Sequence, residues 1–129
     1  MYLDRTSFMF GGSTHENTDA DGDNVWTSFG DVWVLSLPGF HWTLATVSRE
    51  AEDQRAFPVC SVVGQRQLLS LGGHRLFTDD TNKGWSEKDP WPQAVGIYDM
   101  TTWMWQDRYD AGAKPYEQHP ELRAWYDQG

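Results

Sequence analysis

Over most of its length the chain alternates short apolar runs with turn-forming residues. The runs are rich in β-branched and aromatic side chains, and Gly, Pro, Asp and Asn separate them. Runs of this length and composition are typical of strands in packed sheets, and helical periodicity is absent until the C-terminal end of the chain. We therefore expect an all-β fold with strands at residues 7–10, 31–35, 59–63, 68–71, 94–98 and 103–105.

Two turns are predicted between these strands. Residues 63–68 indicate a tight hairpin in which Gly64 adopts a positive φ. In residues 37–40, Pro38 presets its own φ and Gly39 occupies a position that tolerates a positive φ. Residues 100–103 occupy the corresponding place later in the chain.

The sequence contains a two-copy internal repeat. Residues 5–12 align with residues 66–73, and residues 34–42 align with residues 97–105. Each copy consists of an apolar strand ending in Gly-Gly, a long variable loop, a second strand, a turn and a Trp. Because a missed repeat leads to the wrong fold, this pattern decides the architecture that we expect.

This pattern resembles the kelch repeat, which forms one four-stranded antiparallel blade of a β-propeller. The paired signals are Gly11-Gly12 with Trp42 and Gly72-Gly73 with Trp105, and the stretches around them are most similar to fungal kelch-repeat proteins with galactose-oxidase-like propellers. The resemblance implies that the glycines end inner strands where neighbouring backbones crowd, so that a Cβ would clash. It also implies that each Trp fills the wedge between adjacent blades.

The resemblance divides the chain into about two blades and a tail. Residues 1–56 form a first repeat that lacks its opening strand, because no residues before it match 57–63, and residues 57–112 form a complete second repeat. Propellers usually need about four to eight blades. Three explanations stay open: the chain is a piece of a longer propeller, it assembles with further copies of itself into a homo-oligomer, or it covers its exposed sheet with another protein.

The tail, residues 113–129, predicts a short helix that starts near Pro120. Leu122, Trp125 and Tyr126 then share one face through i,i+3 and i,i+4 spacing. We expect this tail to pack against the outside of the last blade or to cap an open sheet edge.

Composition narrows the range of partners. The chain has 129 residues, with 19 Asp and Glu against 10 Lys and Arg and a formal net charge of -9, which argues against nucleic acid or an anionic membrane surface. It contains neither a signal-peptide pattern nor an apolar run long enough to span a bilayer. We therefore expect no membrane span and, if the chain is complete, a cytoplasmic location.

A calcium site is one candidate for chemistry in the loops. Asp19, Asp21 and Asp23 alternate as in the start of an EF-hand loop, but Gly22 and Gly30 stand where that pattern does not place glycine. The favoured interpretation is a solvated acidic loop, and no metal or other cofactor is expected.

Two histidines and two tryptophans are candidates for ligand recognition. His15 and His74 follow the two Gly-Gly pairs, so equivalent loops could present both on one face. Trp85 and Trp91 lie among carboxylates and turn residues in the loop 78–93, a composition typical of peptide or sugar recognition. The alternative for Trp91 is that it folds back and packs beneath the loop.

The single cysteine gives no support to catalysis. Cys60 lies within an apolar strand, where we expect it to act as a small buried apolar group. No base stands near it in the sequence, and it matches no pattern for the Tyr–Cys crosslink of copper-radical oxidases, so the resemblance does not imply oxidase activity.

These observations favour a kelch-repeat binding or scaffold module that acts through its blade loops in protein–protein or ligand recognition. The partner would be another protein or further kelch blades. The alternative is a small enzyme of fungal metabolism with a pocket between blades, although no catalytic residue can be assigned. A deep pocket lined by converging ionisable groups would favour the enzyme, whereas a shallow loop face with an aromatic rim would favour binding.

Overall fold

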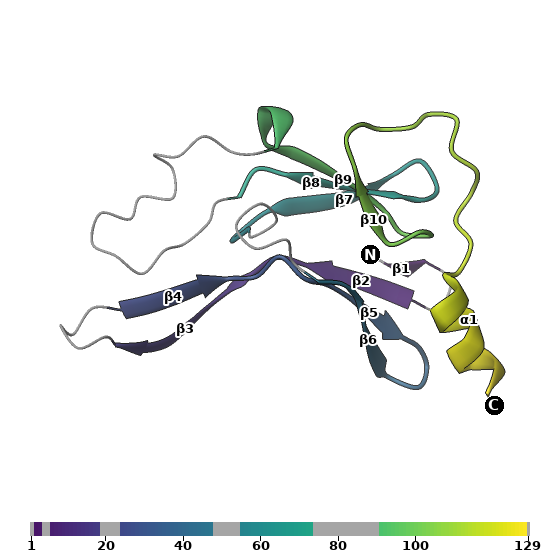
Figure 1. Cartoon of the computed structure of the whole chain (residues 1–129), viewed down its shortest axis with the longest axis horizontal. Coiled ribbons are helices and arrows are strands. Elements are labelled where there is room, and N and C mark those ends of the chain that lie inside the picture. Colours follow the sequence, from purple (N-terminus) through teal and green to yellow (C-terminus); the bar gives the residue numbers. More distant parts are fainter. Residues whose placement is uncertain (1, 4–5, 19–23, 48–54, 74–90, 129) are drawn as a thin grey trace.

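In a computed structural model, the described residues form two stacked four-stranded antiparallel sheets, a β-hairpin and one short C-terminal helix (Figure 1). The structure describes residues 2–3, 6–18, 24–47, 55–73 and 91–128. The first sheet has the strand order β1-β2-β5-β6, the second has the order β7-β8-β9-β10, and β3 and β4 form a separate hairpin. The mostly β fold with a C-terminal helix is as predicted, and no closed propeller is formed by the described residues.

All six predicted strands are present to within a residue or two at either end. Their bounds are Thr6–Phe10 for β2, Val32–Ser36 for β5, Val59–Val63 for β7, Gln67–Leu71 for β8, Val95–Asp99 for β9 and Met104–Gln106 for β10. The further strands are Tyr2–Leu3 for β1, Ser13–Thr18 for β3, Asn24–Ser28 for β4 and His41–Thr46 for β6. A 3-10 turn, η2, covers Pro92–Ala94.

The strand registers of the two sheets match residue for residue under the sequence alignment. In the first sheet Phe8 pairs with Val34, and in the second sheet their aligned counterparts Leu69 and Ile97 pair in the same way. All five pairs between β2 and β5 correspond to the five pairs between β8 and β9. The two sheets are therefore structural copies of each other, each an antiparallel meander in chain order.

The beginning of the first sheet differs from the expectation. The sequence comparison predicted no opening strand ahead of residues 6–10, but Tyr2 pairs with Ser7 and Leu3 with Thr6. The two-residue strand β1 thus stands beside β2 where the five-residue β7 stands beside β8.

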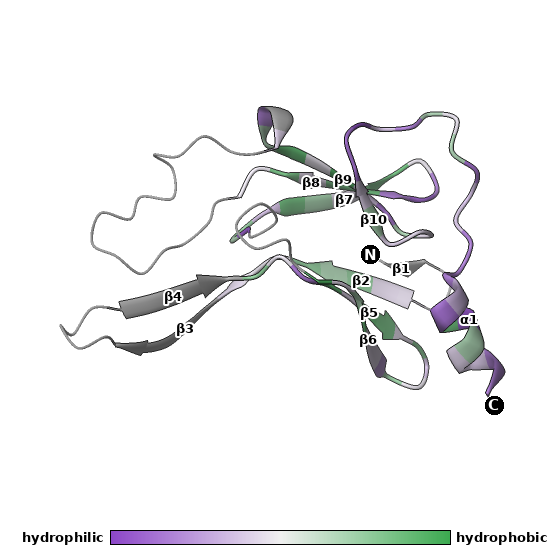
Figure 2. Ribbon diagram, in the orientation of Figure 1, coloured by the Kyte–Doolittle hydropathy of each residue, from purple (hydrophilic) through white to green (hydrophobic). Residues whose placement is uncertain are grey.

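The main core lies between the two sheets and continues beneath the helix. Alternation along each strand sends one set of side chains towards the other sheet. Phe8 meets Tyr98 edge-on with ring centroids 6.4 Å apart, and Phe10 meets Trp105 at 4.9 Å. The buried cluster consists of Phe8, Val32, Val34, Leu68, Tyr98, Met100, Trp103 and Leu122. Figure 2 shows hydrophobic residues concentrated along the stacked strands, whereas the C-terminal tail is mainly hydrophilic.

The turn at residues 37–40 forms, but a different residue takes the left-handed conformation. Phe40 has φ 53° instead of Gly39, and the Leu37–Pro38 peptide bond is cis. Trp103, the aligned counterpart of Phe40, has φ 60°, so the two turns correspond. The lack of a side chain at Gly39 instead makes room for the Trp125 ring, because a Cβ there would lie 2.9 Å from that ring. Gly64 has φ 66°, as the predicted hairpin requires.

The helix α1 spans Pro120–Asp127, which confirms its predicted start. Its predicted face is also confirmed, since Leu122 is fully buried, Trp125 stacks on His41 at 4.7 Å, and Tyr126 donates a hydrogen bond to the Leu37 carbonyl at 2.9 Å. Within the described residues, no helix has the length and apolar character needed to cross a lipid bilayer.

The placement of the tail agrees in part with the expected docking on the last sheet, and it adds a contact with the first sheet. Before the helix, the tail is tied to the second sheet: the Tyr116 amide donates to the Gln65 carbonyl at 3.1 Å, and the Glu117 amide donates to Thr101 Oγ1. The helix then packs on the turn of the first sheet. The tail therefore links the turn ends of both sheets, because each turn presents an aromatic or apolar surface there.

Candidate binding site at the glycine ends of the sheets

The two Gly-Gly pairs face one short segment, residues 55–58, which runs between the sheets. A Cβ on Gly11 would lie 2.9 Å from the Arg55 carbonyl oxygen, and a Cβ on Gly73 would lie 2.9 Å from the Ala56 carbonyl oxygen. Both glycines also have positive φ, 83° and 77°. The expected crowding of backbones at the glycines is therefore present at one glycine of each pair. Gly12 and Gly72 have positive φ as well, but open space lies where a Cβ would point.

Backbone hydrogen bonds hold this segment in place. The Gly12 amide donates to the Arg55 carbonyl at 2.8 Å, the Arg55 amide donates to the Phe29 carbonyl at 3.2 Å, and the Phe29 amide donates to the Gly12 carbonyl at 2.9 Å. The three bonds form a closed cycle among three separate stretches of chain. We call the glycine-end junction the set Gly11, Gly12, Phe29, residues 55–58, Gly73 and Trp91.

A buried cation–π contact lies inside the glycine-end junction. The guanidinium carbon of Arg55 lies 3.9 Å from the centroid of the Trp91 ring, and Arg55 is only 2% exposed. Such a contact is strongest where water is excluded. Phe10 also stacks on the Trp91 ring, with the ring centroids 6.0 Å apart.

This packing agrees with the alternative interpretation of Trp91, in which it folds back and packs beneath the loop. The Trp91 side chain is buried, as in the alternative interpretation, and its ring atoms come within 2.5 Å of where a Cβ on Gly96 would stand. The missing side chain of Gly96 leaves a hollow in the second sheet, and the Trp91 ring fills it. Trp91 therefore packs inside the glycine-end junction, between Arg55, Phe10 and Gly96.

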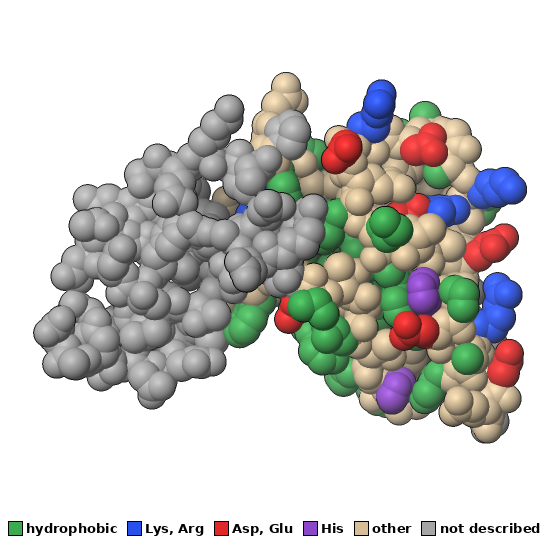
Figure 3. All heavy atoms as spheres, viewed as in Figure 1, with side chains coloured by type: hydrophobic (Ala, Val, Ile, Leu, Met, Phe, Trp, Pro, Cys, Tyr) green, Lys and Arg blue, Asp and Glu red, His purple; other side chains and the backbone are tan. Residues whose placement is uncertain are grey.

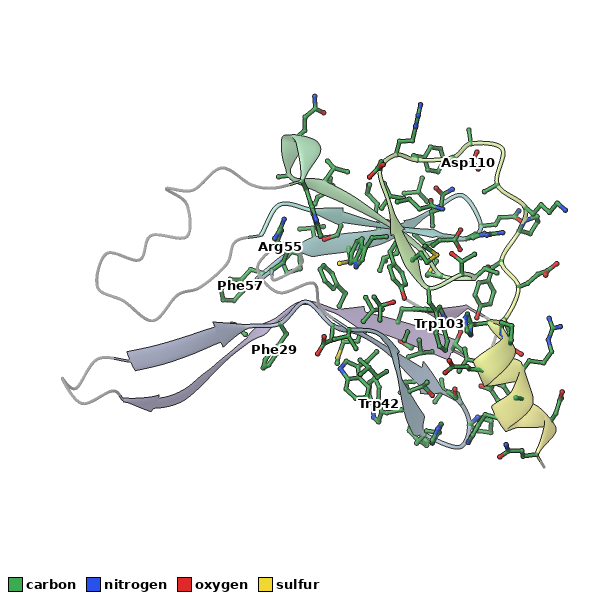
Figure 4. The ribbon with its side chains drawn as sticks, viewed as in Figure 1. Phe29, Trp42, Arg55, Phe57, Trp103 and Asp110 are labelled. Atoms are coloured by element: carbon green, nitrogen blue, oxygen red, sulfur yellow. The ribbon has the colours of Figure 1, made fainter. Side chains whose placement is uncertain are left out.

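Two exposed phenylalanines lie at the surface of the glycine-end junction. Phe57 is 71% exposed with φ 57°, and Phe29 is also exposed. Figure 4 shows Arg55 and Phe57 above the ribbon of the first sheet and Phe29 below it, all at the end of the sheets that lies opposite α1. A bulky residue at positive φ is uncommon and persists only where its surroundings enforce it. The hydrogen-bonded segment beside it supplies that enforcement.

Sequence reasoning missed Phe29 and Phe57 as functional candidates. The available signal was the pairing of Phe57 with Pro58 directly ahead of a strand, and no local pattern places Phe29 beside it. Phe29 and Phe57 belong to one junction because the Arg55 amide, two residues before Phe57, donates to the Phe29 carbonyl. Only the fold creates this bond.

An apolar cleft of about 460 Å³ opens next to the glycine-end junction, between β2 and β7. Its lining consists of Phe8, Met9, Phe10, Pro58, Cys60, Ser61, Val62 and Leu68. Cys60 is exposed there, which corrects the expectation that it is buried, because β7 is an edge strand whose middle residues are not covered. Partial desolvation nevertheless raises the pKa of the Cys60 thiol, which disfavours the reactive thiolate.

A polar cluster at the turn end of the second sheet has a structural role. Asp99 accepts from Arg66 Nε at 2.9 Å, and its other partners are the Thr101 and Thr102 amides and Gln106 Nε2. Burial by itself raises the pKa of Asp99, but the hydrogen bonds from Arg66 and from the two backbone amides outweigh burial and hold the pKa below its usual value. Gln67 exchanges two hydrogen bonds with the Asp110 backbone, each 2.8 Å, and so fastens the segment that leads into the tail to this end (Figure 4).

The remaining predicted site residues are not brought together by the described structure. His15 lies in β3, where its backbone pairs with that of Trp26. His74, Trp85 and the calcium candidates Asp19, Asp21 and Asp23 lie outside the described residues. Among the residues that are described, no three His, Cys, Asp or Glu side chains gather as they would around a metal ion.

The two predicted wedge tryptophans differ in their surroundings. Trp105 packs between the sheets against Phe10, Trp91 and Tyr98, as expected of a wedge. Trp42 is 48% exposed, which corrects the expectation of burial. The reason is its position on the face of the first sheet that is turned away from the second sheet, as Figure 4 shows.

Comparison of the chain with protein-family models, with curated proteins and with solved structures finds no match.

Proposed function

We propose that the chain is a kelch-type β-propeller segment that works as a binding or scaffold module, with its partner held at the glycine-end junction. The observation that carries this proposal is the exposure of Phe29 and Phe57 at a junction whose backbone is tied by three hydrogen bonds among Gly12, Phe29 and Arg55. Aromatic side chains on a rigid support bind partners with a small loss of conformational entropy. Loops and strand ends on a rigid scaffold are also where binding residues concentrate.

The kelch part of the proposal is supported by topology and by the glycines. Both sheets are four-stranded antiparallel meanders with the same register, and in each sheet Gly-Gly follows the second strand. The crowding at Gly11 and Gly73 gives a physical reason for that motif.

The alternative, an enzyme with its pocket between the sheets, has weaker support. The cleft between β2 and β7 is lined mainly by apolar side chains, and Cys60 is the one titratable group among its lining residues. A thiol with a raised pKa is a poor nucleophile at neutral pH. A binding cleft that accepts an apolar side chain of a partner fits this lining better.

The test uses a phage-displayed peptide library selected on the immobilised full chain. The affinities of the selected peptides are then measured for the Phe57→Ala and Phe29→Ala variants. We expect each of these variants to bind about tenfold more weakly or worse, as truncation of an aromatic anchor does.

Phe40→Ala is the matched control, because Phe40 is about as exposed as Phe57 and lies in the turn at the other end of the first sheet. Peptides whose affinity is unchanged in both junction variants, or falls as much in the control, would contradict the proposal.

A further inference from the structure

The two sheets do not pack through equivalent faces. The positions that face the other sheet in one repeat align with the positions that face outward in the other repeat. Side chains at directly paired positions share a face, so Leu68, Tyr98 and Trp105 form the packed face of the second sheet. Their aligned counterparts in the first sheet are Ser7, Leu35 and Trp42, which lie on the side facing away from the second sheet. The contact within the chain is therefore heterologous: one face of a repeat packs on the other face of the next repeat.

The outer face of the first sheet is therefore equivalent, by the repeat, to the packed face of the second sheet. We define it by Met9, Trp33, Leu35, Trp42 and Leu44. Met9 is 50% exposed, Trp42 is 48% exposed, and Leu44 is also exposed. Figure 3 shows hydrophobic side chains at the surface on this side of the first sheet.

The outer face of the second sheet corresponds in turn to the packed face of the first sheet. We define it by Val59, Leu69, Leu71 and Val95, which share one face because Val59 pairs with Leu71 and Leu71 pairs with Val95. Leu69, Leu71 and Val95 align with Phe8, Phe10 and Val32. Phe8 is only 6% exposed, whereas Val59 is 65% exposed and Leu71 is 41% exposed. Ile97 pairs with Leu69 on the same face and is only 5% exposed, so the open part of this face is its glycine end, where Val59 and Leu71 retain apolar side chains.

We propose that a second copy of this chain covers these faces, with the outer face of the first sheet in one copy packed on the outer face of the second sheet in the next copy. The template for this contact is the interface inside the chain. There, Trp105 meets Phe10 at 4.9 Å and Tyr98 meets Phe8 at 6.4 Å. In the contact between copies, Trp42 takes the place of Trp105 against Leu71, and Leu35 takes the place of Tyr98 against Leu69.

The tail leaves the required part of the second sheet open. Its hydrogen bonds reach Gln65 and Thr101, and Asp110, just before the tail, bonds Gln67; all three partners lie at the turn end of the sheet. Leu71 and Val95 lie at the opposite end, next to Gly72 and η2. The uncovered apolar positions of the two outer faces are therefore complementary halves of one interface, and such a contact repeats from copy to copy until the assembly closes.

Charge sets a condition on this association. Each copy carries a formal net charge of -9, so copies repel one another, while the proposed contact itself is apolar. Salt screens the repulsion without weakening apolar contacts. We therefore expect association to strengthen as the salt concentration rises, which is opposite to the behaviour of an interface held by ion pairs.

The experiment is size-exclusion chromatography with light scattering on the full chain, at low and high salt. Two single-face variants are compared: Trp42→Glu blocks the first outer face, and Leu71→Glu blocks the second. Gln128→Glu, at an exposed position after the helix, adds the same charge elsewhere and serves as the control. Met9→Glu and Val59→Glu replace the first two variants if either fails to show the cooperative unfolding of the wild type.

The expected result has three parts. The wild type and the control elute as a discrete oligomer, and each single-face variant elutes as a monomer. An equimolar mixture of the two variants elutes at twice the monomer mass, because each supplies the intact face that the other lacks.

Two results would overturn the proposal. One is a wild-type chain that is monomeric at both salt concentrations. The other is a dimer that one single-face variant keeps by itself, because that pattern belongs to a contact between two identical faces. The inference does not rest on the proposed function, since Phe29 and Phe57 belong to neither defined outer face and the peptide test can fail independently.

Discussion

The Tyr98 hydroxyl donates a hydrogen bond to Thr46 Oγ1 at 2.6 Å, joining the second sheet to the end of the first. The direction follows from Thr46, whose single hydroxyl hydrogen already donates to the Trp103 carbonyl at 2.7 Å. Tyr98 is fully buried, and burial raises the pKa of its phenol far above the usual value. The phenol therefore remains a donor throughout the pH range in which the protein is studied.

Tyr98→Phe removes this inter-sheet bond and leaves the ring packing in place. We expect the free energy of unfolding to fall by about 1–2 kcal/mol, the net contribution of a buried hydrogen bond. Chemical denaturation followed by tryptophan fluorescence measures it. Tyr109→Phe, at an exposed position, is the control and should change stability by less than about 0.5 kcal/mol. Equal losses in the two variants would refute a role for the bond between the sheets.

Asp99→Asn breaks an ion pair at the turn end of the second sheet, where Arg66 Nη2 lies 2.8 Å from Asp99 Oδ2. The substitution leaves the half-buried guanidinium without its counter-charge, so we expect a loss of roughly 2–4 kcal/mol. The exposed Asp107→Asn is the control for removal of one negative charge. Denaturation at neutral pH measures both variants.

The same ion pair predicts the behaviour of the protein in acid. The folded-state pKa of Asp99 lies below its usual value of 3.8, so the folded protein binds this proton less readily than the unfolded chain. The stabilisation is fully present above pH 3.8 and is lost as the pH falls through the folded-state pKa. The difference in stability between the wild type and Asp99→Asn should shrink in that range, and a constant difference would contradict this.

Alanine substitutions should separate the four motif glycines into two classes. Gly12→Ala and Gly72→Ala place a Cβ in open space at a positive φ, which costs about 1–2 kcal/mol. Gly11→Ala and Gly73→Ala meet the same backbone strain and also clash with residues 55–58, which adds about 1–3 kcal/mol. Thermal or chemical denaturation of the four variants gives the ranking. Four equal losses would show that backbone conformation alone explains the motif.

His119 should make the docking of the helix sensitive to pH. Its Nδ1 accepts from the Glu121 amide at 3.2 Å and its ring stacks on Trp103 at 3.8 Å. Burial lowers the pKa of His119 from 6.5, so the folded state takes up this proton less readily than the unfolded chain. The contribution is present above pH 6.5 and is lost as the pH falls from 6.5 through the folded-state pKa.

His119→Ser is the matched variant, because serine caps a helix without titrating in this range. We expect stability to decline between neutral and mildly acidic pH more steeply in the wild type than in the variant. Denaturation at a series of pH values gives both slopes, and equal slopes would refute a contribution from His119.

Local patterns predicted the strands and the helix because these depend on residues close in sequence. The apolar runs, Gly64 in its hairpin and the start of α1 at Pro120 are all as expected. The hairpin of β3 and β4 was missed because its residues are largely polar, and the edge strand β6 was missed because its exposed and half-buried positions follow no simple alternation. The candidate site was missed for another reason, since Phe29 and Arg55 meet only through the fold.

By itself the sequence determined that the chain is built from two copies of one β unit, and the matching strand registers follow from that repeat. Only the tertiary structure decided which copy of each position is covered. Trp42 and Trp105 are equivalent in sequence, yet Trp105 packs between the sheets while Trp42 faces away from them. The physical reason is that alternation along a strand assigns a side chain to a face, whereas burial depends on whether another layer packs against that face.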